Sequence, residues 1–193
     1  FYGIMHFAAA SLVGESMTNP SKYFRNNIAN GINLADAAVA GNIKNFVFSS
    51  TAATFGQPDK CPISENDPQK PINPYGESKR AGEQLMFDYA KETGAKVLVY
   101  RFPNVFGKWC RPNYNSVIAT FCNNIANDLP IQINDASVKL NLVYIDDVVD
   151  ELIAALCGDE HYEDKFGSVK PIYTITLGEI VDLLSSFKNM QQD

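Results

Sequence analysis

The sequence predicts an α/β fold of the Rossmann type, a doubly wound parallel sheet with helices between successive strands. Three short runs rich in aliphatic and aromatic residues recur along the chain, at residues 1–8, 44–50 and 96–101. Helix signals occupy the intervals between them. Because the runs are continuously apolar instead of alternating, we expect strands that are covered on both faces and connected by right-handed βαβ crossovers.

Start and stop residues set the two helices between these strands. Asn19 and Pro20 are suited to start the first helix, and Gly41 to end it. The second helix is expected from Asn73 and Pro74 to Gly94, and it follows a polar loop with prolines at positions 58, 62, 68, 71 and 74. The order strand, helix, strand, helix, strand follows.

The pattern is looser after residue 104. We expect a helix at 116–129, a strand at 137–145, a helix at 146–158 capped by Asp146, and a last helix that opens with a capping box of Thr176 and Glu179. This change predicts a division of the chain into two parts, 1–104 and 105–193.

Composition narrows the class of partner. The chain has 193 residues, a formal net charge of -6 and a pI of about 4.9, so a protein that tracks nucleic-acid phosphates is not expected. No apolar run approaches the roughly 20 residues of a membrane span. The four cysteines form no CxxC pair, and we expect reduced thiols, no metal site and a cytoplasmic location.

The segment "PYGESKRAGEQ" at 74–84 places Tyr75 and Lys79 one helical turn apart on one face. Ligands of an open parallel sheet bind at the carboxyl ends of its strands, where "SSTAAT" adds a cluster of hydroxyl groups. A lysine ammonium beside the phenol would lower the pKa of Tyr75 from about 10. Such a tyrosine is suited to act as a general acid or base.

Five ordered motifs carry a resemblance to a known family. They are "HFAA", "NNIANG", "SSTAATFG", "PYGESK" and "RFPNVFG". Together they resemble the extended short-chain dehydrogenase/reductases that act on nucleotide sugars, the NAD-dependent epimerase/dehydratase family. Residues 1 to about 79 look most like UDP-glucose 4-epimerases, whereas the chain from about Arg101 looks more like the capsular-polysaccharide reductases of a 4-keto UDP-sugar.

The resemblance implies a role for each matching position. Tyr75 is the expected acid/base, Lys79 the residue that lowers its pKa and holds the nicotinamide ribose, and Thr51 a hydrogen-bond partner of the substrate hydroxyl. Further cofactor contacts are expected at Phe7, Ala8, Ala9, Asn27, Ser49, Ser50, Phe102 and Pro103. Asn104 is expected near the sugar diphosphate.

The segment "GKWCRPNYN" leaves two interpretations open. It can be a loop at the rim of the fold, or Lys108 and Arg111 can bind the diphosphate and stack on uracil, which suits a planar guanidinium. The resemblance also implies a homodimer formed partly by the Tyr75 helix, where small Ala81 and Gly82 would allow close packing.

The function that we expect is NAD-dependent 4-epimerisation of a UDP-hexose through transient oxidation at C4, with NADP as an alternative cofactor. The second reading is an NAD(P)H-dependent reductase of a 4-keto UDP-2-acetamido-dideoxyhexose. The third is an inactive truncated domain that only binds partners.

One departure from the family pattern concerns the start of the fold. The sequence has no GxxGxxG turn for the pyrophosphate, and it opens directly on "FYGIMHFAAA", a run typical of a buried strand. The resemblance therefore implies a partial dinucleotide-binding Rossmann domain at 1–104, without its first βαβ unit, and a substrate-binding portion at 105–193. We expect weak or no dinucleotide binding by the chain alone.

Overall fold

The computed structural model describes all residues except 58–66, 164 and 191–193. The chain divides into two compact units, the first made of residues 1–102 and 151–168 and the second of 103–150 and 169–193. The expected domain division after residue 104 stays a prediction. Residues 151–168 group with the first unit because strand β7 (Phe166–Gly167) pairs with β3 (Lys96–Phe102).

The sheet of the first unit has the order β1-β2-β3-β7-β6. Strands β1 (Ile4–His6), β2 (Asn45–Thr51) and β3 are parallel, with Ile4 opposite Phe46 and Asn45 opposite Lys96. The short strand β6 (Tyr162–Glu163) is antiparallel to β7. The predicted α/β class with a parallel Rossmann-type sheet is confirmed, although the first strand is shorter than the expected run of 1–8.

The first connection is helical over nearly the whole expected interval. Helices α2 (Pro20–Tyr23) and α3 (Asn30–Ala40) are joined by a π-helical segment, η1 (Phe24–Ala29), and Gly41 follows the last turn. The sequence did not predict α1 (Val13–Thr18), which is short and has no side-chain cap at its N-terminus. The π-helical hydrogen bonding of η1 was also not predicted.

Helix α4 (Pro74–Thr93) has the predicted ends. The Asn73 Oδ1 atom accepts a hydrogen bond from the Gly76 amide at 2.8 Å, and Pro74 occupies the first turn. At the other end Gly94 has a left-handed φ of 67°, a conformation that glycine adopts without a steric penalty. A short 3-10 helix, η2 (Ala52–Phe55), lies between β2 and the loop before α4.

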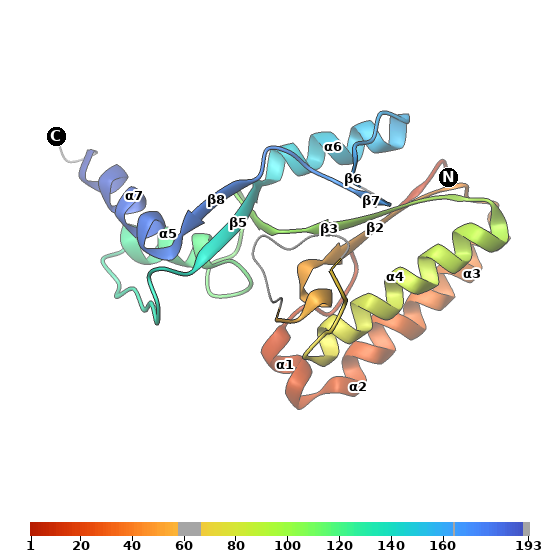
Figure 1. Ribbon diagram of the computed structural model, residues 1–193, viewed down its shortest axis with the longest axis horizontal. Helices are drawn as coiled ribbons and strands as arrows, with labels where there is room; N and C mark the ends of the chain where they lie inside the picture. Colours follow the sequence, from red (N-terminus) through yellow and green to blue (C-terminus); the bar gives the residue numbers. More distant parts are fainter. Residues whose placement is uncertain (58–66, 164, 191–193) are drawn as a thin grey trace. The chain divides into compact units, whose positions relative to one another are not determined.

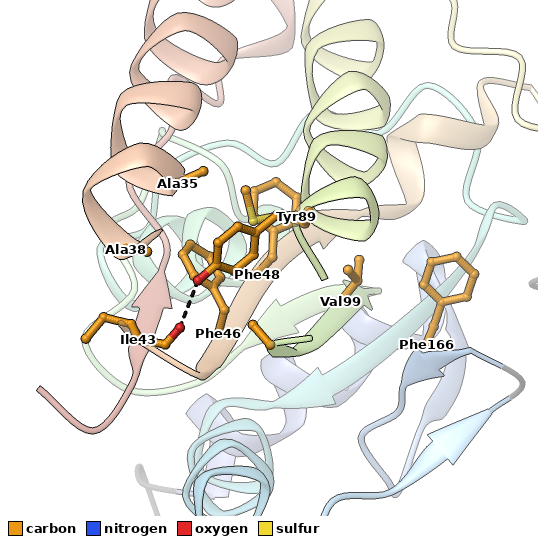
Figure 2. Packing of buried hydrophobic residues seen from close by; sticks show 10 residues of the cluster. Ala35, Ala38, Ile43, Phe46, Phe48, Tyr89, Val99 and Phe166 are labelled. Atoms are coloured by element: carbon orange, nitrogen blue, oxygen red, sulfur yellow. Dashed lines mark hydrogen bonds between the residues drawn. The ribbon is translucent and has the colours of Figure 1, made fainter. Parts of the chain in front are cut away.

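Helices α3 and α4 run side by side on one face of the sheet (Figure 1). Figure 2 shows Ala35 and Ala38 of α3 and Tyr89 of α4 packed around Phe46 and Phe48 of β2. The buried Tyr89 hydroxyl donates to the Ile43 carbonyl at 2.8 Å, so its one polar atom is satisfied. This core fixes α4 against the strand whose carboxyl end carries the hydroxyl cluster.

Two glycines allow α4 to approach its neighbours closely. A Cβ atom at Gly76 would lie 2.5 Å from the Ala53 carbonyl oxygen, and one at Gly82 would lie 2.8 Å from the tip of the Phe48 ring. Gly82 therefore faces the core of its own unit. The expectation that Gly82 lies at the surface for a partner helix is wrong, because the pitch of α4 turns it toward β2.

The second unit holds a three-stranded sheet in the order β4-β5-β8. Strand β4 (Asn104–Phe106) is parallel to β5 (Lys139–Tyr144), and β8 (Tyr173–Thr176) is antiparallel to β5. Helices α5 (Val117–Ala126) and α7 (Leu177–Met190) pack together over Phe121 and Ile180. The predicted elements of this half are present, and β4 and β8 are additional.

Helix ends in this half follow the sequence with one correction. Thr176 and Glu179 form the expected capping box of α7, since the Glu179 amide donates to Thr176 Oγ1 at 3.2 Å and the Thr176 amide to Glu179 Oε2 at 2.8 Å. Helix α6 (Ile145–Cys157) begins one residue before Asp146. Asp146 is therefore in the first turn and is not the expected cap.

Within the described ranges, no helix is long and apolar enough to cross a bilayer, and no group of three metal-ligating side chains occurs. Cys110, Cys122 and Cys157 are free and exposed. Cys61, Pro58 and Pro62 lie outside the described residues.

We predict opposite effects for alanine at two helical glycines. Gly76→Ala should lower the free energy of unfolding by about 1–3 kcal/mol, because the new methyl group meets the Ala53 carbonyl. Gly31→Ala in α3, whose Cβ would meet only Leu85 at 3.7 Å, should raise it by about 0.5–1 kcal/mol. Urea unfolding of both variants checks this, and equal effects would contradict the close approach of α4 to η2.

Candidate active site

The candidate site lies at the carboxyl ends of β1 and β2, beside the first turn of α4. Helix α4 begins there because Asn73 caps it and Gly76 lets its first turn touch η2. Tyr75 and Lys79 follow one turn apart on this helix. The parallel sheet brings Thr51 and Ser49, from the end of β2, to the same edge.

Two residues of β2 contact the two predicted catalytic residues of α4. The Thr51 side chain lies near the Tyr75 phenol and favours its ionised form. The Lys79 Nζ atom donates to the Ser49 carbonyl oxygen at 2.7 Å. Thr51 also accepts the Ala53 amide at 3.2 Å as the N-cap of η2. The structure thus brings the three predicted catalytic residues, Thr51, Tyr75 and Lys79, into one cluster.

The protonation of Tyr75 differs from the expectation. Its pKa is raised above 10.0, chiefly because burial disfavours the phenolate, and the Thr51 side chain only partly opposes this rise. Its ring also meets the buried Tyr23 ring edge to face at 6.4 Å. The expected lowering by Lys79 is absent in the chain alone, because the Lys79 ammonium is directed to the Ser49 carbonyl.

Lys79 is itself strongly affected by burial. Its side chain lies over the Phe48 ring, 5.1 Å from the centroid. Desolvation lowers its pKa from 10.5 to about 8, and the negative charge of Glu83 partly offsets this lowering. The nearby His6 also has a lowered pKa, mainly through burial and secondarily through the Lys79 charge.

Ser50, expected to contact a cofactor, points to the other side of β2. Alternate residues of a strand face opposite sides, so Ser50 shares the face of Phe46 and Phe48 and donates to Glu83 Oε1 in the core. Ser49 and Thr51 share the opposite face. The hydroxyl of Ser50 is therefore engaged within the chain, and a cofactor contact there is not favoured.

Glu83 and Arg101 form a buried ion pair next to this serine. The Arg101 guanidinium donates to both carboxylate oxygens of Glu83, at 2.9 Å and 2.7 Å. Their side chains are 4% and 3% exposed. The guanidinium also lies over the rings of Phe55 and Phe166.

Asn27 is buried and pairs with backbone. Its Oδ1 atom accepts the Ala10 amide at 2.8 Å, and its Nδ2 atom donates to the Ala10 carbonyl at 3.0 Å and to Ser78 Oγ at 2.9 Å. Asn27 thus fastens the loop after β1 to α4. A cofactor contact at Asn27 stays a prediction that these bonds do not favour.

The end of β1 and the end of β3 hold the remaining predicted cofactor residues of the first unit. Phe7 is 51% exposed, Ala8 is exposed and Ala9 is half-buried. Phe102 is half-buried and stacked on Tyr100, with ring centroids 5.6 Å apart. These residues present an open apolar surface beside the polar cluster.

The second unit carries the predicted substrate-binding residues. Asn104 is exposed and donates to the Asn141 carbonyl at 3.3 Å. Lys108 is bound to Asp146 at 2.9 Å, and this ion pair raises the pKa of Lys108. Arg111 is exposed and lies 6.0 Å from the Tyr114 ring centroid.

The loop that carries Lys108 and Arg111 presents further side chains to solvent. Trp109 is 95% exposed and has a φ of 68°, a strained value for a non-glycine residue. Pro103, which precedes β4, is half-buried. The loop therefore offers an indole, a phenol and a guanidinium without burying any of them.

A cavity of about 360 Å³ in the first unit lies elsewhere on α4. Arg80, Gln84, Phe87, Glu83 and Arg101 contribute to its lining, whereas Thr51, Tyr75 and Lys79 do not. Because the three predicted catalytic residues do not line this cavity, we place the candidate active site at the strand ends, where those residues lie together.

Sequence reasoning missed Tyr23, Glu83 and Arg101. A signal for Glu83 was present, because it continues the four-residue spacing of Tyr75 and Lys79. Tyr23 had no such signal. It is fully buried, and its one hydroxyl proton lies between the Leu12 carbonyl and the Glu15 carboxylate, which only the folded chain brings together.

Comparison with known proteins shows the family of the chain. The model of the NAD dependent epimerase/dehydratase family matches residues 2–165. The chain is 46% identical over 120 residues to UDP-2-acetamido-2,6-beta-L-arabino-hexul-4-ose reductase of Pseudomonas aeruginosa, covering 62% of this chain and 32% of the relative. It is 52% identical over 105 residues to UDP-glucose 4-epimerase of Lacticaseibacillus casei, covering 54% and 32%.

A solved structure is similar over nearly the whole chain. UDP-glucose 4-epimerase of Thermotoga maritima, determined with UDP-glucose, superposes with a TM-score of 0.85 at 28% identity, covering 97% of this chain and 61% of that chain. The chain spans about a third of the length of the two curated relatives.

We predict that Lys79 makes stability depend on pH. Because its folded pKa of about 8 lies below 10.5, the unfolded chain holds an extra proton between these values. Relative to Lys79→Met, the free energy of unfolding should therefore rise with pH through this window, by on the order of 3 kcal/mol. Urea unfolding of both proteins at pH 7 to 10.5 measures it, and parallel pH curves would contradict the burial of the charge.

Proposed function

Since the chain belongs to the NAD dependent epimerase/dehydratase family, we propose that it carries the catalytic residues of an enzyme that epimerises a UDP-hexose at C4. The observation that carries the proposal is the cluster of Thr51, Tyr75 and Lys79 at the strand ends. The similarity to two UDP-glucose 4-epimerases supports the substrate class.

The residues present fit the nicotinamide-ribose part of a dinucleotide. The Lys79 ammonium uses one bond for the Ser49 carbonyl and has two further protons to donate to ribose hydroxyls. Exposed Phe7 and Ala8 provide apolar surface for a flat ring. Ala9, Phe102 and Pro103 are the other proposed contacts. When bound, NAD supplies a hydride acceptor and donor at C4 of the sugar.

The proposed work of the protein residues is proton transfer. The Tyr75 oxygen, as phenolate, takes the proton of the sugar 4-hydroxyl and later returns it. Because the hydride that leaves C4 would also return to C4, no net redox change occurs. Thr51 orients that hydroxyl group and stabilises the phenolate. Since the pKa of Tyr75 is raised in the chain alone, positive charge near the phenol is needed for this step, and Lys79 is the nearest proposed source.

A reductase of a 4-keto UDP-sugar is the second candidate. It is favoured by the 46% identity to the Pseudomonas aeruginosa reductase. In that reaction the Tyr75 hydroxyl gives its proton to the carbonyl oxygen of the substrate. Both candidates use the same cluster, but an epimerase retains its dinucleotide, whereas a reductase must release it after each turnover.

The remaining assignments are proposals as well. Asn104, Lys108 and Arg111 are proposed to bind the UDP part of the substrate, and NAD is preferred to NADP because of the epimerase similarity. We also propose a cytoplasmic homodimer. Ala81, half-buried on α4, remains available for a helix contact in it, whereas Gly82 does not.

We predict that protein from the complete reading frame converts UDP-galactose to UDP-glucose without added cofactor. Proton NMR of the anomeric signals follows the reaction. Tyr75→Phe should lower the rate by roughly 100-fold to 10,000-fold, because it removes the acid/base. No conversion, together with NADPH consumption in the presence of a 4-keto UDP-sugar, would favour the reductase, and inactivity in both assays would refute the enzyme proposal.

A second prediction concerns the exposed loop of the second unit. Arg111→Ala should raise the Michaelis constant for the UDP-sugar by roughly tenfold or more, with a smaller effect on turnover, because it removes charged hydrogen bonds to the diphosphate. Arg111→Lys keeps the positive charge but loses the planar guanidinium, so its Michaelis constant should lie between those of the wild type and Arg111→Ala. An unchanged Michaelis constant in Arg111→Ala would support the rim-loop interpretation.

A further inference from the structure

We propose that Glu83, clamped by Arg101 and Ser50, is the positioning residue that holds the Tyr75 and Lys79 face of α4 in register with the end of β2. This inference rests on the proposed function for its catalytic consequence. The placement of α4 by Glu83 is argued from contacts within the chain and does not depend on that function.

The first argument is the order of contacts between α4 and β2. Tyr75, Lys79 and Glu83 are spaced four residues apart and so lie on one face of the helix. Each lies beside a different one of three consecutive β2 residues. Lys79 donates to the Ser49 carbonyl, Glu83 accepts from the Ser50 hydroxyl, and Tyr75 lies near Thr51. A shift of α4 along β2 would therefore disturb all three contacts.

The second argument is that Glu83 makes more hydrogen bonds than Tyr75 or Lys79 and is the most constrained of the three side chains. Its Oε1 atom accepts from Ser50 Oγ and from Arg101 Nε, and its Oε2 atom accepts from Arg101 Nη2 and from Gln69 Nε2 at 2.8 Å. The donors come from β2, β3 and the loop before α4. A carboxylate that accepts four hydrogen bonds from three segments has one position and one orientation.

The third argument is the rigidity of Arg101. Its guanidinium lies 3.5 Å from the Phe166 ring centroid and 4.7 Å from that of Phe55, so its plane is held between β7 and η2. Bidentate pairing with a carboxylate adds a fixed angle. Glu83 therefore ties the orientation of α4 to that of the sheet, through its ion pair with Arg101 of β3.

Electrostatics gives Glu83 a second effect on the cluster. Among the described groups, the charges coupled to Lys79 are Glu83 of α4 and His6 of β1. Glu83 raises the pKa of Lys79 against desolvation, and His6 titrates below its ordinary pKa of 6.5. Glu83 is thus the negative charge that favours the ammonium form.

Glu151 provides a matched control. It is a second buried carboxylate of the same unit, 7% exposed, and it accepts from the Tyr100 hydroxyl at 2.7 Å and from the His161 amide at 2.9 Å. It binds no residue of α4. Glu151→Gln should therefore lower stability without affecting Lys79.

The first experiment reads the cluster without using activity. The 13Cε chemical shift of Lys79, in ¹³C-lysine protein and assigned with Lys79→Met, is followed against pH. In Glu83→Gln the pKa of Lys79 should fall below its wild-type value of about 8, and Glu151→Gln should leave it unchanged. An unchanged pKa in Glu83→Gln, or an equal fall in both variants, would overturn the proposal.

A second variant protects this experiment against misfolding. Glu83→Gln leaves the Arg101 guanidinium buried without its partner, which can prevent folding. The double variant Glu83→Gln with Arg101→Met removes both charges and should show a smaller fall in the pKa of Lys79, because the Arg101 charge that disfavours the ammonium is removed together with the Glu83 charge that favours it. Glu83→Asp keeps the charge and should restore most of the wild-type value.

The second experiment tests the catalytic consequence in protein from the complete reading frame. Per folded molecule, Glu83→Gln should lower turnover by about 10-fold to 100-fold with a smaller change in the Michaelis constant, because misplaced groups lose rate. Glu151→Gln should keep wild-type turnover. Equal turnover in Glu83→Gln and wild type would overturn the positioning role. If the wild-type protein is inactive on UDP-sugars, the proposed function is refuted, and the NMR experiment alone then tests the role of Glu83 in placing α4.

Discussion

The candidate site depends on the register between helix α4 and strand β2. A helix that packs on a parallel sheet can slide or rotate, and a hydrophobic contact alone sets its position loosely. Here Gly76 and Gly82 allow close approach, and polar contacts then fix the position. Because the carboxyl end of β2 supplies these contacts, the strand that forms the core also sets the geometry of the polar cluster.

The pleat of β2 divides its terminal hydroxyl groups between two tasks. Ser50 faces the core under α4 and completes a buried ion pair, while the half-buried Ser49 and Thr51 lie on the opposite side of the strand at its end, where Thr51 meets Tyr75 in the first turn of α4. Asn27 likewise uses its polar atoms within the chain, since both the oxygen and the nitrogen of its side-chain amide bind the Ala10 backbone. Polar residues near a site are thus often needed to build its frame, and only part of a cluster reaches a ligand.

Local signals explain how much could be predicted from the sequence. The parallel sheet, α4 with its Asn73 and Gly94 ends, and the meeting of Tyr75 and Lys79 with the hydroxyl groups after β2 follow from periodicity, caps and strand order. The choice of Thr51 among those hydroxyl groups came from the family resemblance. The direction of the Tyr75 pKa shift did not follow, because it depends on burial. Strand β7 was missed because two residues carry no periodic pattern, although Phe166 covers Arg101.

The π-helical segment η1 has a consequence for sequence comparison. A π turn holds one residue more than an α turn over the same length, as if a residue had been inserted into an ordinary helix. A relative with a regular helix here is one residue shorter, so a gapless alignment shifts every position on one side of Phe24–Ala29. Asn27 lies inside the segment, and its equivalent in another protein is identified by its bonds to backbone and not by its place in the alignment.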